Sequence, residues 1–302
     1  MLNVILETCA GTLTQGLIYA ILSYGIFITY KILDFPDLTV DGSFPLGAAV
    51  TAVLLTHGVN AWLTLPIALV IGALAGLCTG LIHVRAKVRD LLAGIITMTA
   101  LYSINLQIAG SNLMVERAID TIYTSAPVMA LLGSVPLLYR KLIVSLVLVL
   151  LIGLVLEWYF STKNGLLLRA VGDNDTLVTT LAVDKGRMKI LGLVIANALV
   201  ALSGCIVCQE GRSFSATMGT GQMVFGLAAV IIGTTLFRRM SFVKGTAAVV
   251  IGSILYKACI QIAILLGLPG NMLKFITAAL FLVILITGNL SGRKGGADRA
   301  GA

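Results

Sequence analysis

Long apolar segments follow one another along almost the whole chain, separated by short polar connections. A helix needs about 20 apolar residues to cross a bilayer, whereas a transmembrane β-barrel would show alternating segments of about 10 residues. The pattern predicts an all-α bundle of about eight to ten membrane spans, forming one domain over residues 1–302. The apolar segments are residues 11–32, 42–56, 62–82, 91–109, 142–159, 190–208, 222–236, 245–266 and 275–287.

The second, seventh and ninth segments are short for a full crossing, which favours broken or re-entrant helices. Two of them open alike: GSFPLGAAV starts at Gly42, and GQMVFGLAAV starts at Gly221. In the topology argued below they run in opposite directions, as the halves of an inverted repeat do. Paired short spans interrupted by Gly or Pro are typical of a translocation pathway. Chance similarity between apolar segments is the alternative explanation.

The composition supports a membrane protein and constrains its orientation. Of the 302 residues, 58% are hydrophobic and 11% are charged, whereas soluble domains carry about 25% charged residues. With the N-terminus outside, fifteen of the 21 Lys and Arg residues lie in cytoplasmic connections or in the cytoplasmic tail, residues 290–302. This is what the positive-inside rule requires. The same rule explains the net charge of +8 without nucleic-acid binding.

One long polar stretch, residues 161–189, interrupts the apolar pattern. Asp173, Asn174 and Asp175 are residue types that cap helix N-termini, so we expect a short amphipathic helix over residues 176–183. This helix either rests on the membrane as a connector or inserts into a cleft on a soluble motor. The chain has no G-x-x-x-x-G-K-S/T motif, so ATP and Mg²⁺ would be bound by a separate ATPase.

Polar residues inside or beside the apolar segments are candidates for a solute pathway. Residues 33–44 are either a solvated loop or the broken entry to a pathway helix. In the fourth segment, the polar side chains of Asn105 and Gln107 need hydrogen-bond partners that lipid does not supply. We therefore expect them to face other helices or a water-lined path. The full candidate set is Asp41, Gly42, Ser43, Gly47, Thr97, Asn105, Gln107, Gln222, Gly226 and Lys257.

Lys257 stands near the middle of the eighth segment. A charge at that depth costs about 2.5–3.5 kcal/mol on insertion scales. We therefore expect Lys257 to face the bundle interior or a partner subunit, near Gln261. Three roles remain open: contact with the solute or a gate, structural pairing, and snorkelling to an interface.

No constellation of catalytic or metal-binding residues emerges. His57 and His83 lie far apart in the sequence, without clustered carboxylates. Cys205 and Cys208 form a C-x-x-C pair inside an apolar segment, where packing of small side chains is a simpler interpretation than metal or redox chemistry. We expect neither enzyme activity nor a cofactor in this chain.

Several motifs, in order, carry a family resemblance. They are G-x-x-x-x-G-A at 42–48, G-x-x-x-R-A at 165–170, Met-Gly at 218–219 and AAVIIG at 228–233. The chain resembles bacterial ABC importer permeases of the branched-chain amino acid permease type. Residues 35–44, FPDLTVDGSF, depart from the form usual there. They are similar to a subgroup associated with aromatic amino acids or undefined small solutes.

The resemblance implies a bacterial inner-membrane permease with several partners. These are a second permease copy (a homodimer rather than a heterodimer), two cytoplasmic ATPase subunits and an external solute-binding protein. It also implies that the second and seventh segments line the central path at the dimer interface, and that residues 165–186 contain the helix that couples to the ATPase. The predicted coupling residues are Gly165, Arg169, Ala170, Asp173, Asn174, Asp175 and Thr176.

We therefore predict the transmembrane subunit of an ABC importer for a small solute, such as an amino acid, aromatic ones included. One alternative is a secondary transporter driven by an ion gradient, which shares inverted repeats and broken helices. Such a transporter would more often bury acidic residues within its spans, whereas the mid-span charge here is Lys257. Another alternative is a membrane scaffold without transport activity.

Overall fold

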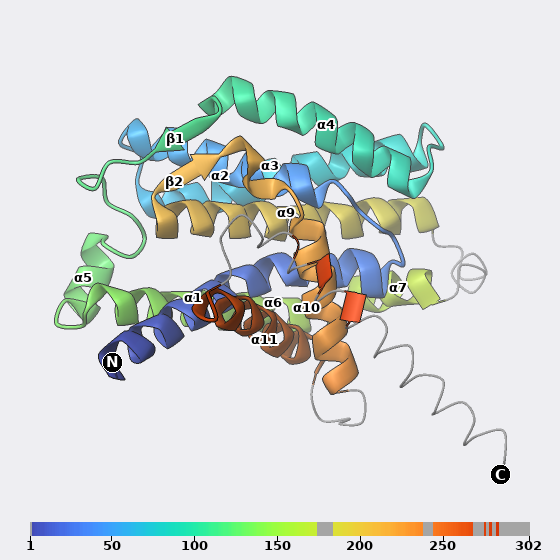
Figure 1. Ribbon diagram of the computed structural model, residues 1–302. Coiled ribbons are helices and arrows are strands. Elements are labelled where there is room, and N and C mark those ends of the chain that lie inside the picture. Colours follow the sequence, from blue (N-terminus) through green and yellow to red (C-terminus); the bar gives the residue numbers. More distant parts are fainter. Residues whose placement is uncertain are drawn as a thin grey trace, which may run out of the picture.

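The computed structural model of the protein describes residues 2–173, 184–237 and 244–267, with single helical positions between 275 and 283. Within these residues, seven helices are long and apolar enough to cross a membrane, and α2 (Val40–Thr56) is apolar but shorter. The predicted all-α membrane bundle is confirmed (Figure 1). The seven are α1 (Leu2–Ile26, continued by the π-helical η1, Phe27–Ile32), α3 (Ala61–Val84), α4 (Asp90–Ala109), α6 (Leu137–Ser161), α9 (Lys185–Gly211), α10 (Gln222–Leu236, preceded by the 3-10 turn η2, Ala216–Gly219) and α11 (Gly245–Leu265).

Short elements mark the two ends of the bundle (Figure 1). Helix α7 (Lys163–Asp173) lies at one end, which we call the α7 end. Helix α5 (Ala126–Leu132) lies at the other, the α5 end, beside an antiparallel pair of strands. Strand β1 (Asn112–Met114) pairs with β2 (Ser213–Ser215) there. The sequence pattern does not predict the two strands or α5, because strands of three residues and a helix of seven residues carry almost no periodic signal.

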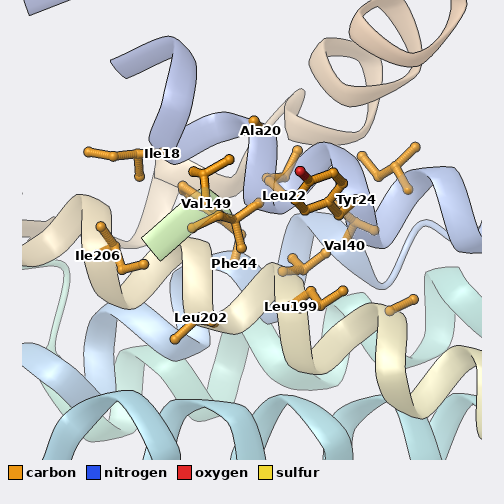
Figure 2. Close-up of a cluster of buried hydrophobic side chains, with 14 of the residues drawn as sticks. Ile18, Ala20, Leu22, Tyr24, Val40, Phe44, Val149, Leu199, Leu202 and Ile206 are labelled. Carbon is orange, nitrogen blue, oxygen red and sulfur yellow. The ribbon is translucent and has the colours of Figure 1, made fainter. Parts of the chain in front are cut away.

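Helix α9 runs through the middle of the bundle. It packs against α2 and α3 on one side and against α1 on the other, while α4 covers α2 (Figure 1). Figure 2 shows the apolar core that this arrangement creates: side chains such as Leu22 of α1, Phe44 of α2, Val149 of α6 and Leu202 of α9 converge and are buried. This central position makes α9 the element on which both halves of the protein pack.

The glycines at 72, 76 and 80 explain the close contact between α3 and α9. A Cβ atom added at Gly72 would overlap the carbonyl oxygen of Asn197, and one added at Gly76 would overlap that of Leu193. Only glycine permits this backbone approach, as the G-x-x-x-G-x-x-x-G spacing predicts. The three glycines of this motif therefore serve the packing of α3 on α9.

The order of elements repeats. A long helix, an irregular connection, a short helix and a second long helix occur as α1–α2–α3 and again as α9–α10–α11. The packing repeats as well, because α3 packs on α9 and α2, while α11 packs on α1 and α10. Helix α2 runs toward the α5 end, whereas α10 leads to the connection before Lys244, which pairs with Glu157 near the α7 end. The two short helices thus run in opposite directions, as predicted.

Charged side chains differ between the two ends. The basic connection 85–89 before α4 and helix α7, which contains Lys163 and Arg169, lie at the α7 end, and the N-terminus lies at the α5 end (Figure 1). Helix α6 begins at Leu137 rather than at residue 142 as expected, so its first turns contain Arg140 and Lys141. Arg140 donates from Nη2 to the Val135 carbonyl (3.0 Å), and Lys141 Nζ pairs with Glu210 Oε1 (2.8 Å). These bonds give Arg140 and Lys141 polar partners in the first turns of α6.

Candidate translocation pathway

The connection between η1 and α2 folds back into the bundle. Leu33, Phe35, Asp37 and Thr39 are all buried, and the Phe35 ring meets the His83 ring edge-on. Of the two possibilities left open by the sequence, the structure supports a re-entrant segment covered by protein. Helix α2 consequently starts inside the bundle instead of at its surface.

Asp37 anchors this re-entrant segment at mid-depth. Its Oδ2 atom accepts a hydrogen bond from Asn197 Nδ2 (2.7 Å), and its Oδ1 atom accepts one from the Thr39 amide (2.9 Å). Ser43 Oγ donates to Asn197 Oδ1 (2.6 Å). Ser43, a predicted pathway residue, therefore belongs to a buried network that ties α2 to the middle of α9.

Asp41 joins the two short helices. Its Oδ2 atom accepts from the Gly221 amide (3.0 Å), and its Oδ1 atom accepts from the Met223 amide (2.8 Å). A carboxylate from the first turn of α2 thus caps the N-terminus of α10, where free amides and the helix dipole favour negative charge. The N-termini of both short helices meet at this point, which we call the Asp41 junction.

Helix α4 closes one side of the Asp41 junction. Asn105 Nδ2 donates to the Gly42 carbonyl (3.1 Å), while its Oδ1 atom is buried without a partner. A cavity of about 270 Å³ opens beside the junction. Its lining combines a carboxylate, hydroxyl groups and a phenol, so it accommodates polar atoms. The lining residues are Asp41, Gly42, Pro45, Met98, Thr99, Tyr102, Ala216 and Thr220.

Lys257 lies on another side of the first turn of α10. Its Nζ atom is 3.6 Å from the centre of the Tyr19 ring and 5.2 Å from that of Phe225. Nearby, Gln222 donates from Nε2 to the Met218 carbonyl (2.8 Å), and its Oε1 atom is buried without a partner. The ammonium is directed at α1 and α10, so the snorkelling alternative does not describe its position.

The other predicted pathway residues do not join these two groups. Gly47 packs against the backbone of Ala201, and Gly226 packs against Leu22 and Ile26, so both serve helix contacts. Thr97 bonds back to its own helix at the Ala93 carbonyl, and Gln107 lies exposed on α4. Asn197 is not among the predicted residues, since the sequence around an isolated Asn in an apolar segment does not indicate its hydrogen-bond partner.

The predicted coupling segment is described in part. Gly165 and Ala170 lie in α7, where Gly165 packs against the Tyr159 backbone and Arg169 stacks 4.9 Å above the Phe160 ring. Asp173 is the last residue of α7. Asn174, Asp175, Thr176 and the helix expected over 176–183 lie outside the described residues. Asp184 caps α9, accepting from the Gly186 amide (2.9 Å).

A multi-pass helical bundle with two interrupted helices meeting at its centre defines a membrane transport protein. The chain belongs to the family of branched-chain amino acid transport system permease components, whose model matches residues 8–285. It is therefore the permease component of an ABC transporter, a transmembrane subunit that is not itself catalytic. No solved structure gives a significant match.

Three relatives indicate the range of the family. The chain is 38% identical to the tyrosine transport system permease protein of Clostridioides difficile, over 93% of this chain and 91% of that protein. It is 26% identical to the ribose import permease protein RbsC of Haemophilus influenzae, over 78% and 68% of the two chains. It is 27% identical to the probable branched-chain amino acid transport permease protein LivH of Methanocaldococcus jannaschii, over 64% and 63%.

Proposed function

We propose that this permease carries an aromatic amino acid such as tyrosine into the cytoplasm, driven by ATP hydrolysis on a separate chain. The similarity to a tyrosine transport permease, which extends over almost the full length of both chains, supports this solute class. The departure of residues 35–44 from the usual branched-chain form agrees with it. The observation that carries the proposal is the Asp41 junction, where two helices of opposite direction begin inside the bundle.

The Asp41 junction suits a movable gate. Helices α2 and α10 are held together there by hydrogen bonds to one carboxylate, and the cavity beside it is lined by α2, α4 and the turn that precedes α10. Rigid rotation of one half-bundle against the other would exchange these bonds while leaving the helices intact. The solute passes along this junction in our proposal, and alternating access follows from opening it first to one side and then to the other.

The α7 end is the proposed site of force input. Helix α7 and the segment up to Asp184 form the coupling region, which contacts a cytoplasmic ATPase pair that binds ATP and Mg²⁺. This places the α7 end in the cytoplasm and the N-terminus outside, in agreement with the basic residues gathered around α7. A second copy of the permease and an external solute-binding protein complete the transporter.

Uptake into vesicles tests the proposal. The permease is reconstituted with its ATPase and its external binding protein, and uptake of radiolabelled L-tyrosine, L-leucine and ribose is compared. We expect tyrosine uptake that requires ATP, disappears when the ATPase is catalytically inactive, and survives a protonophore. Uptake that needs no nucleotide but collapses with the protonophore would establish a secondary transporter instead. Transport of leucine or ribose in preference to tyrosine would overturn the solute class.

A further inference from the structure

One side of the bundle, formed by α1, α10 and α11, carries polar side chains at the depth of the bilayer. Tyr19, Gln222 and Lys257 are half-buried there, so each keeps part of its surface open. Polar groups in contact with lipid are costly. This side, which we call the Lys257 face, must therefore be covered by water or by protein in the membrane.

Two further amides extend the Lys257 face toward the α5 end. Helices α1 and α11 are antiparallel, because Gly245 packs against Phe27 and Gly16 packs against Ile254. Gln15 lies one turn before Tyr19 in α1, and Gln261 lies one turn after Lys257 in α11. Because the two helices are antiparallel, Gln15 and Gln261 both lie on the α5 side of Tyr19 and Lys257. Gln15 is exposed and Gln261 is half-buried, so hydrogen-bonding groups continue from Lys257 toward that end.

The charge of Lys257 has no counter-ion among the described residues. Glu210 is paired with Lys141 (2.8 Å). The carboxylate of Asp41 is occupied by amides of α10. The ammonium therefore rests on the faces of Tyr19 and Phe225. Such contacts stabilise a cation by about 0.5–2 kcal/mol, less than the cost of holding the charge in the bilayer.

Lys257 lies out of reach of lipid phosphate and of Glu7 in a second copy. Phosphate groups lie at the bilayer surface, whereas Lys257 is at the level of the first turn of α10. Twofold symmetry about the membrane normal keeps each residue of a second copy at its own depth. The acid of α1, Glu7, lies twelve residues before Tyr19, about 18 Å along the helix. An anion that arrives from solution has neither restriction.

We infer that Lys257 receives the carboxylate of the permeating solute. An ammonium and a carboxylate form a charge-assisted hydrogen bond, which is stronger than a neutral one. The buried Gln222 Oε1, which has no partner in this structure, accepts a bond from the solute's amino group. The inference rests on the proposed function and adds to it the residue that recognises the solute inside the membrane.

The test uses the complete transporter in vesicles, with three single variants. Lys257→Met removes the charge and keeps the length of the side chain, Lys257→Arg keeps the charge, and Lys31→Met removes an exposed lysine elsewhere. The measurements are the rate of L-tyrosine uptake, the ATPase activity stimulated by loaded binding protein, and the subunit composition in detergent. We expect Lys257→Met to lower uptake by about tenfold, the size of one hydrogen bond to a charged group. Lys257→Arg should restore most of the rate, and Lys31→Met should match the wild type.

The outcomes separate the inference from the proposed function. Wild-type uptake of tyrosine with an equally active Lys257→Met variant would overturn the inference alone. So would an arginine variant no better than the methionine variant. Dissociation of the permease dimer in Lys257→Met would show that the lysine holds subunits together. If the wild type takes up no tyrosine under any condition, the proposed function fails and the inference fails with it.

Discussion

At the scale of single residues, Asp41 links two helices that are far apart in the sequence. It belongs to the first turn of α2, yet its two oxygens bind amides at the start of α10, 180 residues or more away in the sequence. A capping carboxylate normally stabilises its own helix. Here it fixes the relative position of two helices that run in opposite directions. Its charge also offsets the positive end of the α10 dipole.

Asp41→Asn tests this role with almost no change in shape. One of the two positions that accept backbone amides becomes an NH₂ group, so a donor faces a donor and the charge is lost. We expect the variant to lose about 1–2 kcal/mol of stability, seen as a lower Tm in detergent, and to lose most tyrosine uptake. Asp34→Asn is the matched control, because Asp34 is exposed. Equal Tm and uptake in the two variants would contradict the capping role.

Residue types indicated part of this site before the structure was known. The broken segment before α2 predicts Asp41 and Gly42, polarity within an apolar segment predicts Asn105, and the structure brings all three together. Gly47 and Gly226 were placed in the same set because glycine marks close approach, but their close neighbours are helix backbone and apolar side chains. The absence of a Cβ atom permits either use, so the sequence does not distinguish a pathway glycine from a packing glycine.

At the scale of elements, length was the informative quantity. Helix α2 has 17 residues, and α10 has 15 and reaches the length of a span only together with the 3-10 turn η2 before it. The short apolar segments can be recognised in the sequence, and they predict interrupted spans. The pairing of β1 with β2 was not legible, because three-residue strands about 100 residues apart leave no local pattern. Helix α7 was also missed, since a stretch of polar residues at its start hides its apolar face.

Helix α7 makes a second prediction possible. Arg169 is exposed and stacks on Phe160 at the end of α6, so it links the coupling region to a membrane span. Arg169→Ala should leave assembly intact and reduce uptake several-fold, while ATP hydrolysis continues. The ratio of tyrosine transported to ATP hydrolysed measures this directly. Arg187→Ala is the control, because Arg187 is exposed and pairs only with Asp184 three residues earlier. An unchanged ratio in Arg169→Ala would exclude this link.

At the scale of the whole molecule, the two halves differ in what their short helices contact. Helix α2 is enclosed by α3, α4 and α9, whereas α10 packs on α1 and α11 beside the Lys257 face. The two halves share an order of elements, but different helices surround their short helices. The Asp41 junction lies where these surfaces meet. A small rotation of one half against the other would therefore change access to the centre from both ends.

The central claim is that solute passes along the Asp41 junction and that ATP bound elsewhere switches its access. Thr220 is exposed and lines the cavity beside Asp41. The direct measurement is the labelling rate of Thr220→Cys by an impermeant maleimide, in complete transporters whose native cysteines are replaced by serine. We predict that the rate differs at least about tenfold between the nucleotide-free and ATP-trapped states, and that bound tyrosine slows it. Equal labelling in both states, with transport intact, would contradict the account.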